Sequence, residues 1–289
     1  MNPQQFASTV RDWYAEHARD LPWREPDVTP WGVLVSEVML QQTPAARVAP
    51  AWREWMARWP TPADLAAAPP GEAVRQWGRL GYPRRALRLH ATAVALLADH
   101  GGIVPADYDE LRALPGVGSY TAAAVAAFGY GTRQPVLDTN VRRVYARFFD
   151  GKYDATTTSP TVAERAAALN RVPREQPERY SVAVMELGAL LCTAQAPRCA
   201  GCPLAGGCAW LAAGKPPAEV TRKPQPYAGT DRQVRGRLLA VLRDAPDPVW
   251  QDSLVAVWDD ATQRERALAG LLDDGLVQRA ADGRFQLPR

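Results

Sequence analysis

Lysine is nearly missing from this sequence. It occurs only at Lys152, Lys215 and Lys223, and the first 151 residues contain none. Enzymes that work through a Schiff base need an amine, so the first half of the chain offers no lysine for that chemistry. The positive charge is almost all arginine, and 34 basic against 31 acidic residues give a net charge of only +3. A balance this small permits a nucleic-acid partner without requiring one.

Long apolar runs are also missing. No stretch approaches the roughly 18 apolar residues that a membrane-spanning helix needs. The first residues, Met-Asn-Pro-Gln-Gln-Phe, lack the basic and apolar segments of a signal peptide. We therefore expect no membrane association and a cytoplasmic location, where cysteines stay reduced.

Cysteine is absent outside one short stretch. All four cysteines lie within seventeen residues, as Cys192-x6-Cys199-x2-Cys202-x5-Cys208. Four thiolates this close together can converge on one centre but cannot link distant parts of a fold. Structural zinc sites usually have two C-x2–4-C pairs joined by a longer arm. One tight pair flanked by single cysteines instead favours a 4Fe–4S cluster, with a four-thiolate zinc site and free thiols as the alternatives.

The hydrophobic pattern before residue 212 is helical, and a convincing strand alternation is absent before residue 230. Proline or glycine breaks separate the apolar segments. The predicted helices cover residues 6–17, 31–41, 44–59, 84–100, 119–129, 139–149, 159–170 and 177–192.

The composition changes after residue 212. Residues 213–229 are proline-rich and predict a linker. The elements predicted beyond it are helices over 232–243, 251–258 and 261–273, and hairpin strands over 276–279 and 284–287. Three helices and a terminal hairpin suggest a winged-helix-like module over 230–289. DNA contact and a packing or partner role are both open for it.

A glycine-rich turn joins two of the predicted helices, with the sequence Leu-Pro-Gly-Val-Gly-Ser at 114–119. Glycine lets a backbone approach a ligand closely, and the next helix presents N–H groups that favour a phosphate. Gly116, Val117, Gly118 and Ser119 are therefore candidates for contact with a DNA backbone without sequence readout. A plain turn with a glycine cap explains the motif equally well.

Two carboxylic acids stand in contrasting surroundings. Glu37 is the only charged residue in the largely apolar run 33–43, and Asp138 precedes a predicted helix. Burial would raise the pKa of Glu37 and keep it protonated, whereas the helix N-terminus is expected to lower the pKa of Asp138. Such a pair could supply an acid and an electrostatic stabiliser. Taken singly, Glu37 could face solvent and Asp138 could be an ordinary N-cap.

Arginines gather in two places. The clusters are Arg79, Arg84, Arg85 and Arg88, and Arg142, Arg143 and Arg147. Taken alone, each cluster predicts the solvated face of a helix.

Residues 1–212 resemble the adenine DNA glycosylases of the helix-hairpin-helix superfamily, which excise adenine mispaired with 8-oxoguanine. Several collinear motifs carry the resemblance. They are Leu21-Pro22-Trp23-Arg24, the run SEVMLQQT at 36–43, Gly81-Tyr82, Leu114–Gly118, Leu137-Asp138-x-Asn140-Val141-x-Arg143-Val144, Glu186–Ala189 and the four cysteines. The hairpin and the cluster are shared with endonuclease III enzymes, whereas the Glu37 motif points to adenine.

The resemblance implies a role for each matching residue. Glu37 looks like the acid that protonates adenine N7, and Asp138 like the carboxylate that stabilises the oxocarbenium-like sugar. Asn140 resembles the polar residue that supports Asp138, and Tyr120 falls near the base. The implied substrate-binding residues are Trp23, Arg24 and Glu186 at the adenine pocket, Gln42 and Tyr82 as the wedge that fills the base stack, and Leu40 and Thr43 beside Gln42.

The resemblance also implies a mostly α-helical, two-lobed fold. The expected domains are a cluster domain of 1–22 and 133–212 with its cluster loop at 192–208, a barrel with the hairpin over 23–132, the linker and the C-terminal module. The expected partner is double-stranded DNA carrying A·8-oxoguanine or A·G mispairs, bound by a monomer associated with the nucleoid. The module leaves room for a repair-protein partner.

Two other functions remain as alternatives. A bifunctional glycosylase/lyase would need an amine, but position 120, where the lyase relatives carry lysine, is tyrosine. A non-enzymatic Fe–S DNA-binding regulator gives no reason for Glu37 and Asp138 to occur together. The chain departs from the family in having too short and helical a C-terminus for a Nudix-like domain, which leaves its preference for 8-oxoguanine open. Pro83 stands where many members have a second aromatic.

Overall fold

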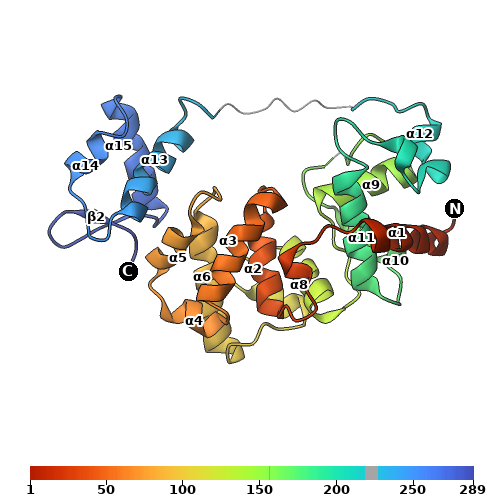
Figure 1. Cartoon of the computed structure of the whole chain (residues 1–289), viewed down its shortest axis with the longest axis horizontal. Helices are drawn as coiled ribbons and strands as arrows, with labels where there is room; N and C mark the ends of the chain where they lie inside the picture. Colours follow the sequence, from red (N-terminus) through yellow and green to blue (C-terminus); the bar gives the residue numbers. More distant parts are fainter. Residues whose placement is uncertain (156, 219–226) are drawn as a thin grey trace. The chain divides into compact units, whose positions relative to one another are not determined.

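The computed structural model describes residues 1–155, 157–218 and 227–289, and it is mostly helical with one small sheet. The predicted fold class is confirmed (Figure 1). Contacts divide the chain into two compact units. Unit 1 comprises Met1–Arg24, Ala106–Arg112 and Val117–Arg222, and unit 2 comprises Glu25–Pro105, Ala113–Gly116 and Lys223–Arg289. None of the helices in the described ranges is long and apolar enough to cross a membrane.

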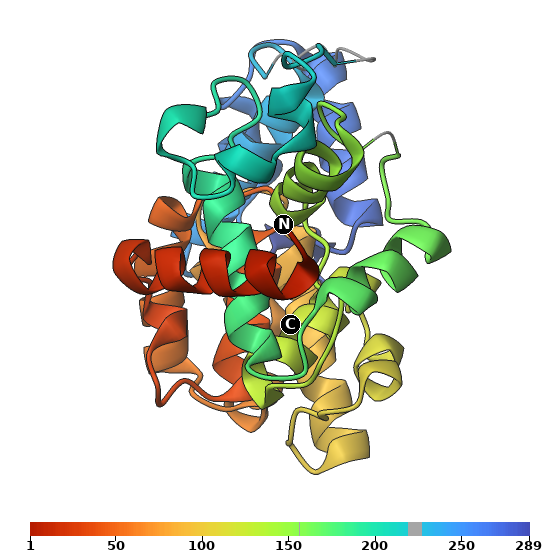
Figure 2. The ribbon, with the colours of Figure 1, turned by 90° about the vertical axis from the view of Figure 1, so that its right-hand side faces the viewer.

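Unit 1 is built round three helices that share one apolar core. Its elements are α1 (Pro3–His17), η1 (Pro22–Arg24), α7 (Tyr108–Ala113), α8 (Ser119–Tyr130), α9 (Thr139–Asp150), α10 (Val162–Arg171), α11 (Pro177–Leu190), η2 (Cys199–Gly201), η3 (Ala205–Gly207) and α12 (Ala209–Ala212). Helix α1 lies across α11, which also packs on α9 (Figure 2).

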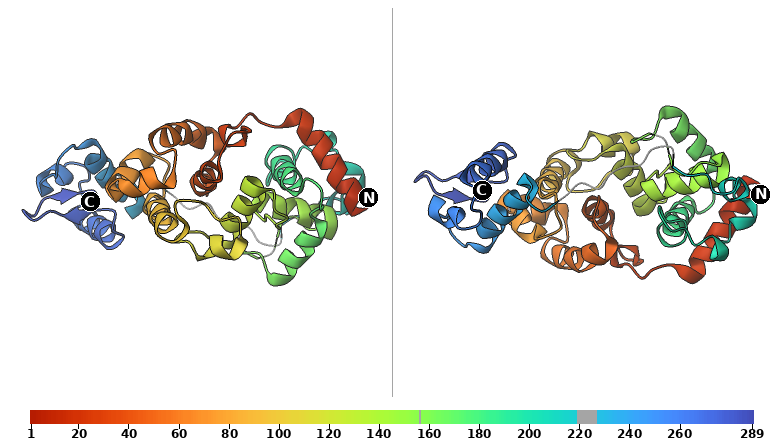
Figure 3. Two further views of the ribbon diagram at one scale, coloured as in Figure 1. Left: turned by 90° about the horizontal axis from the view of Figure 1, so that it is seen from below. Right: turned by 90° about the horizontal axis from the view of Figure 1, so that it is seen from above.

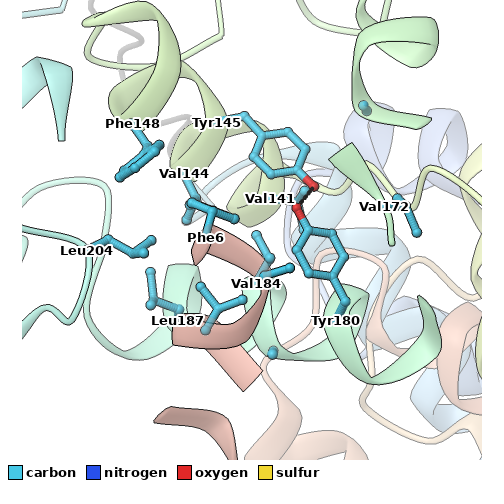
Figure 4. Close-up of a cluster of buried hydrophobic side chains, with 14 of the residues drawn as sticks. Phe6, Val141, Val144, Tyr145, Phe148, Val172, Tyr180, Val184, Leu187 and Leu204 are labelled. Carbon is cyan, nitrogen blue, oxygen red and sulfur yellow. Dashed lines mark hydrogen bonds between the residues drawn. The ribbon is translucent and has the colours of Figure 1, made fainter. Parts of the chain in front are cut away.

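The core of unit 1 forms because α1, α9 and α11 each turn an apolar face inward. Phe6 of α1 packs its ring 4.8 Å from that of Phe148, and Leu187 of α11 is buried beside them (Figure 4). The hydroxyls of Tyr145 and Tyr180 are 3.0 Å apart, so each buried phenol has a hydrogen-bond partner. This packing fixes the start of α9, which carries Asp138.

Unit 2 contains a helical barrel and the C-terminal module. The barrel helices are α2 (Pro30–Leu40), α3 (Ala45–Arg58), α4 (Pro62–Ala67), α5 (Pro70–Trp77) and α6 (Arg84–His100). Helices α4 and α5 pack on α6, and α2 packs on α3. Helix α2 is apolar along most of its length, and it is accordingly buried on every side from Trp31 to Met39.

Three tryptophans fill the barrel beneath the loop at residue 81. The rings of Trp55 and Trp59 are 4.7 Å apart, and those of Trp55 and Trp77 are 5.7 Å apart, both edge to face. The Trp77 indole N–H donates to the carbonyl of Gly81 at 2.9 Å. The loop that carries Tyr82 is therefore tied to the aromatic core.

The C-terminal module has the predicted three helices and hairpin, which form one group in Figure 3. They are α13 (Asp231–Asp244), α14 (Gln251–Val255), α15 (Ala261–Asp273), β1 (Gln278–Arg279) and β2 (Phe285–Gln286). The strands pair antiparallel, and Val249 bridges to Phe285. Helix α14 ends three residues before the predicted end at 258. Of the predicted linker 213–229, residues 219–226 lie outside the described residues.

The module packs against the barrel inside unit 2. The Gly71 N–H at the start of α5 donates to the carbonyl of Pro288 at 2.7 Å. A side chain at Gly71 would bring its Cβ within 2.8 Å of the Leu287 Cβ, so only glycine allows this approach.

Contacts also place α8 in unit 1, whereas we predicted it in the barrel. That the predicted domains fold separately stays a prediction.

Candidate active site and cluster loop

Asp138 is the N-cap of α9, and its carboxylate is held by two donors. Its Oδ1 accepts from the Val141 N–H at 2.6 Å, and its Oδ2 accepts from the Asn140 side-chain amide at 2.8 Å. We expected the helix N-terminus to lower its pKa. That expectation is wrong, because burial raises the pKa of Asp138 above its usual value despite both hydrogen bonds and the charge of Arg143.

Arg143 joins this carboxylate to the cluster loop. It donates to the Asn140 side-chain oxygen at 2.7 Å, to the Gly188 carbonyl at 2.8 Å and to the Cys192 carbonyl at 2.6 Å. A Cβ on Gly188 would lie 2.8 Å from that of Asn140, so glycine is needed where α11 meets α9. The resemblance supplied Arg143 only as part of a motif, and the structure gives it a positioning role.

Two of the predicted substrate-binding residues contact each other in unit 1. The carboxylate of Glu186 is fully buried on α11, and Arg24 donates to it at 2.8 Å. Arg19, which sequence analysis missed, donates to it through two side-chain nitrogens at 2.8 and 2.7 Å and through its own backbone N–H. Burial opposes ionisation, but these donors and the charge of Arg24 lower the pKa of Glu186 to about 2.

The stability of unit 1 is expected to depend on pH through Glu186. Because its folded pKa is about 2, below the usual value near 4.5, its contribution is present above about pH 4.5 and is lost as the pH falls towards 2. Glu186→Gln should reduce the unfolding free energy by about 2 kcal/mol at pH 7 and by much less near pH 3. Urea unfolding at several pH values measures this. Glu175→Gln, at an exposed carboxylate, is the control, and a pH-independent loss for Glu186→Gln would contradict the assignment.

Glu37 lies in unit 2, on the buried helix α2. Only 4% of the residue is exposed, so the solvent-facing alternative is wrong. Its helix neighbours Val33, Leu34 and Val38 are all buried and apolar. The sequence had predicted this apolar setting.

The two predicted wedge residues share an unusual backbone conformation. Gln42 has φ of 55° and Tyr82 has φ of 48°, in the left-handed region that residues other than glycine rarely adopt. Tyr82 is 46% exposed. Leu40, at the end of α2, is half-buried, and Thr43 is buried with its hydroxyl 3.3 Å from the Leu80 carbonyl.

Arg85 connects the two wedge loops. From the first turn of α6 it donates to the carbonyls of Val38, Met39 and Gln41 at 2.9, 2.9 and 2.6 Å. It also donates at 3.0 Å to the Thr43 hydroxyl on one loop and to the Gly81 carbonyl on the other. Its guanidinium stacks over the rings of Trp77 and Tyr82. Burial lowers the pKa of Arg85 to about 10.

The prediction that both arginine clusters form solvated helix faces is therefore wrong in part. Arg85, Arg142, Arg143 and Arg147 are buried, with at most 6% exposed. Backbone carbonyls satisfy most of their donors, and Glu164 pairs with Arg142 at 2.6 Å. Charge counting on a helix cannot reveal such acceptors, because they come from segments distant in sequence.

The glycine turn is built as the motif predicts. Gly116 has φ of 77°, and an added Cβ would lie 2.8 Å from the Arg88 Cβ. Gly118 is the N-cap of α8 and provides no side-chain acceptor for the first N–H groups of that helix. Val117 is buried, and the Ser119 hydroxyl accepts from Arg165 at 2.5 Å. Tyr120 is half-buried against the apolar cluster of α8.

The four cysteines lie together on the loop after α11. All are half-buried free thiols, and Cys192, Cys202 and Cys208 pack against the core of unit 1. Arg147 anchors the loop by donating to the Thr193 carbonyl at 2.8 Å, and its nitrogen lies 3.4 Å from the Cys192 sulfur.

The thiols influence one another electrostatically. Burial, reinforced by the neighbouring thiols, raises the pKa of Cys202 to about 11, and burial also raises the pKa of Cys192. Within the described ranges, no group of three or more His, Cys, Asp and Glu side chains is positioned to hold a metal ion.

Known proteins identify the family. The model of the HhH-GPD superfamily base excision DNA repair proteins matches residues 35–170. A Mycobacterium tuberculosis protein named adenine DNA glycosylase is 56% identical over 99% of this chain and 95% of its own length. The chain belongs to the adenine DNA glycosylases. A Mycolicibacterium smegmatis adenine DNA glycosylase is 53% identical over 95% of this chain and 93% of its length.

A solved structure places this adenine DNA glycosylase among related folds. A thermostable thymine-DNA glycosylase matches with a TM-score of 0.68 and 27% identity, over 73% of this chain and 97% of its own. The comparison thus leaves about a quarter of our chain unmatched, whereas the mycobacterial adenine DNA glycosylases match almost all of it.

Proposed function

We propose that this adenine DNA glycosylase excises adenine mispaired with 8-oxoguanine or guanine from double-stranded DNA. The family supports a base excision repair N-glycosylase. The observation that carries the proposal is the presence of two buried carboxylic acids, one in an apolar helix and one held by N–H donors. Glu37 is buried in an apolar helix, and Asp138 is held by donors at a helix N-terminus. One is suited to deliver a proton and the other to carry negative charge.

The reaction follows from these two groups. The extruded adenine is a poor anionic leaving group, so Glu37 donates a proton to a ring nitrogen and the base departs neutral. Asp138 stabilises the positive charge left on the sugar, and Val141 and Asn140 keep its carboxylate in place. Water adds its oxygen to the sugar carbon and releases a proton, which restores the acid form of Glu37. The products are free adenine and an abasic site.

The enzyme is proposed to be monofunctional. Strand cleavage through a Schiff base requires an amine, and Tyr120 occupies the position after the glycine turn. The strand should therefore remain intact until alkali is added. A protein–DNA adduct trapped by borohydride would favour the lyase alternative instead.

Tyr82 and Gln42 are proposed to fill the stack once the base is extruded. An aromatic ring replaces lost stacking worth about 1–3 kcal/mol. Tyr82→Ala should therefore weaken mispair binding about five- to 150-fold, the range that this energy implies. Fluorescence anisotropy with a mispaired duplex measures the change. Tyr130→Ala removes an exposed tyrosine elsewhere and is the matched control; equal affinities for the two variants would make Tyr82 a packing residue.

The cysteine loop is proposed to hold one 4Fe–4S cluster. The donors fit in number and type, because four half-buried free thiols share one loop that is anchored to α9 and to the core. Close thiolates repel one another, and a cationic cluster would offset that repulsion. The cluster would order the loop, and Arg198 beside Cys199 could then meet a phosphate.

Purified protein is expected to be yellow-brown and to contain about four irons per chain. Iron and zinc analysis with an absorption spectrum near 400 nm measures this. Cys199→Ser should lose the iron and part of its folding stability, whereas Ser253→Ala, far along the chain, should lose neither. Colourless protein with one zinc per chain would show that the zinc alternative is right.

Single-turnover excision tests the function. Adenine release should be fastest from A·8-oxoguanine, slower from A·G and slowest from A·C. Release of an oxidised pyrimidine with no release of adenine would overturn the proposal in favour of an endonuclease III-like enzyme. Binding with no base release would favour the DNA-binding regulator.

A further inference from the structure

A cavity of about 990 Å³ opens inside unit 2, between the barrel and the C-terminal module. One wall is the loop that carries Tyr82 together with the start of α6, and the other is helix α13. Both wedge residues, Gln42 and Tyr82, line it. The cavity therefore lies beside the residues proposed to enter the base stack.

The lining of the cavity is strongly positive. Nine arginines and one acidic residue, Asp274, line its described surface, for a formal charge of +8. The entire chain carries only +3, so the remainder is net acidic. Asp274 is shared by Arg235 and Arg84, the latter at 3.1 Å.

Contacts hold the two walls together. Arg75 of α5 donates to the carbonyls of Arg243 and Ala245 on the module, the second at 3.1 Å, and Arg243 donates back to the Gly78 carbonyl. The Gly71–Pro288 hydrogen bond adds a third link. Hydrogen bonds between its walls therefore make this cavity, called the arginine groove below, part of the folded unit 2.

The positively charged residues of the groove are arginines, which favours phosphate as the ligand. Arginine presents a planar fork of N–H donors that matches phosphate oxygens, and no lysine lines the described part of the groove. The exposed arginines Arg79 and Arg237 lie on opposite walls. One nitrogen of Arg237 donates to the Val257 carbonyl at 3.3 Å, and its guanidinium stacks over Trp258. The Arg232 guanidinium lies 5.6 Å from the centre of the Tyr82 ring, which links the module to the wedge directly.

We propose that this arginine groove binds the phosphodiester backbone of duplex DNA next to the wedge. The C-terminal module is then part of the DNA-binding surface, and it acts through α13. Two arginines of α15, the third helix of the module, lie outside the groove. Arg266 pairs with Asp231 at 2.7 Å, and Arg264 donates to the Trp258 carbonyl at 2.5 Å.

The salt dependence of binding to a fully paired duplex tests the groove, since such a duplex offers no mispaired base. Each lost phosphate contact should reduce the slope of log K against log salt by about 0.9 and weaken binding roughly eightfold at 0.1 M salt. Arg79→Gln and Arg237→Gln should each show this change, and the double variant twice the change in slope. Arg53→Gln/Arg279→Gln removes two exposed arginines of the same unit outside the groove and should bind like the parent.

A second variant leaves every charge in place. Gly71→Ala favours the α5 helix locally but displaces Leu287 and Pro288. It should weaken duplex binding and lower the slope while the helix content is retained. If Arg79→Gln and Arg237→Gln both show the salt dependence of the parent, the proposal is wrong. An acidic protein would then be the better candidate for the partner of the groove. A change in Arg79→Gln alone would overturn the role of the module.

The inference rests on the proposed function, but the two can fail separately. If the parent protein releases adenine from mispairs and the groove variants bind duplex like the parent, only the groove is wrong. If the groove variants lose phosphate contacts but the parent releases no base, the proposed function is wrong and the DNA-binding groove remains.

Discussion

Glu37→Gln and Asp138→Asn are each expected to slow single-turnover adenine release by at least about a hundredfold, because acid catalysis and charge stabilisation each contribute that much. Glu37→Gln keeps the size of the side chain but cannot deliver an acidic proton. Asp138→Asn keeps the N-cap acceptor for Val141 but removes the negative charge. Quenched-flow or manual sampling with excess enzyme measures the rates.

The controls for these variants separate chemistry from folding. Both should bind a mispaired duplex with nearly the parent affinity, and both should keep cooperative unfolding. Glu175→Gln and Asp252→Asn make the same atomic changes at exposed positions and should excise at the parent rate. If either catalytic variant kept more than about a tenth of the rate, its assigned role would be wrong.

The pH dependence of the rate offers a further check on Asp138. Burial raises its pKa, so protonation would remove its negative charge at a higher pH than for an ordinary aspartate. The rate is therefore expected to fall as the medium becomes acidic, beginning above the pH of about 4 at which a free aspartate titrates.

Arg85→Met is expected to reduce the free energy of unfolding by about 3 kcal/mol or more. The variant leaves the buried carbonyls of Val38 and Met39 without this donor, and each unsatisfied group costs about 1–3 kcal/mol. Chemical denaturation measures the loss. Arg53→Met, at an exposed site in the same unit, should change stability little.

The functional consequence of Arg85→Met is more specific than lost stability. Because Arg85 holds the loops of Thr43 and Gly81 together, the variant should slow excision at temperatures where it remains folded. In a double-mutant cycle, Tyr82→Ala should have little further effect on mispair binding in the Arg85→Met background. Additive effects of the two substitutions would limit Arg85 to a purely structural role.

The sequence allowed much of the fold to be predicted, for physical reasons that apply residue by residue. Apolar periodicity located the long helices, and proline set the starts of α2 and α11 at Pro30 and Pro177. Helix α10 begins at Val162 rather than near 159, because Thr161 supplies the N-cap hydroxyl to Glu164. The short helices α4 and α5 lie between prolines that we interpreted only as breaks.

The site was less accessible to sequence analysis. The motifs located Glu37 and Asp138, but periodicity could not show that Arg85 and Arg143 are buried, since their acceptors are carbonyls of other segments. Arg19 was missed for the same reason, because its partner Glu186 lies 167 residues away. The direction of the Asp138 pKa shift was also missed, because burial depends on the packing of the whole of unit 1.

The hydrogen bond between the Trp77 indole and Gly81 makes the wedge loop optically observable. Trp77 is 1% exposed and contacts the Arg85 guanidinium, so its emission depends on the polarity of this one environment. Displacement of the loop by DNA would alter that polarity and change the fluorescence without an attached dye. Since the chain has ten tryptophans, the difference between the parent and Trp77→Phe would isolate this signal. Stopped-flow mixing could then time the insertion of the wedge separately from the departure of the base.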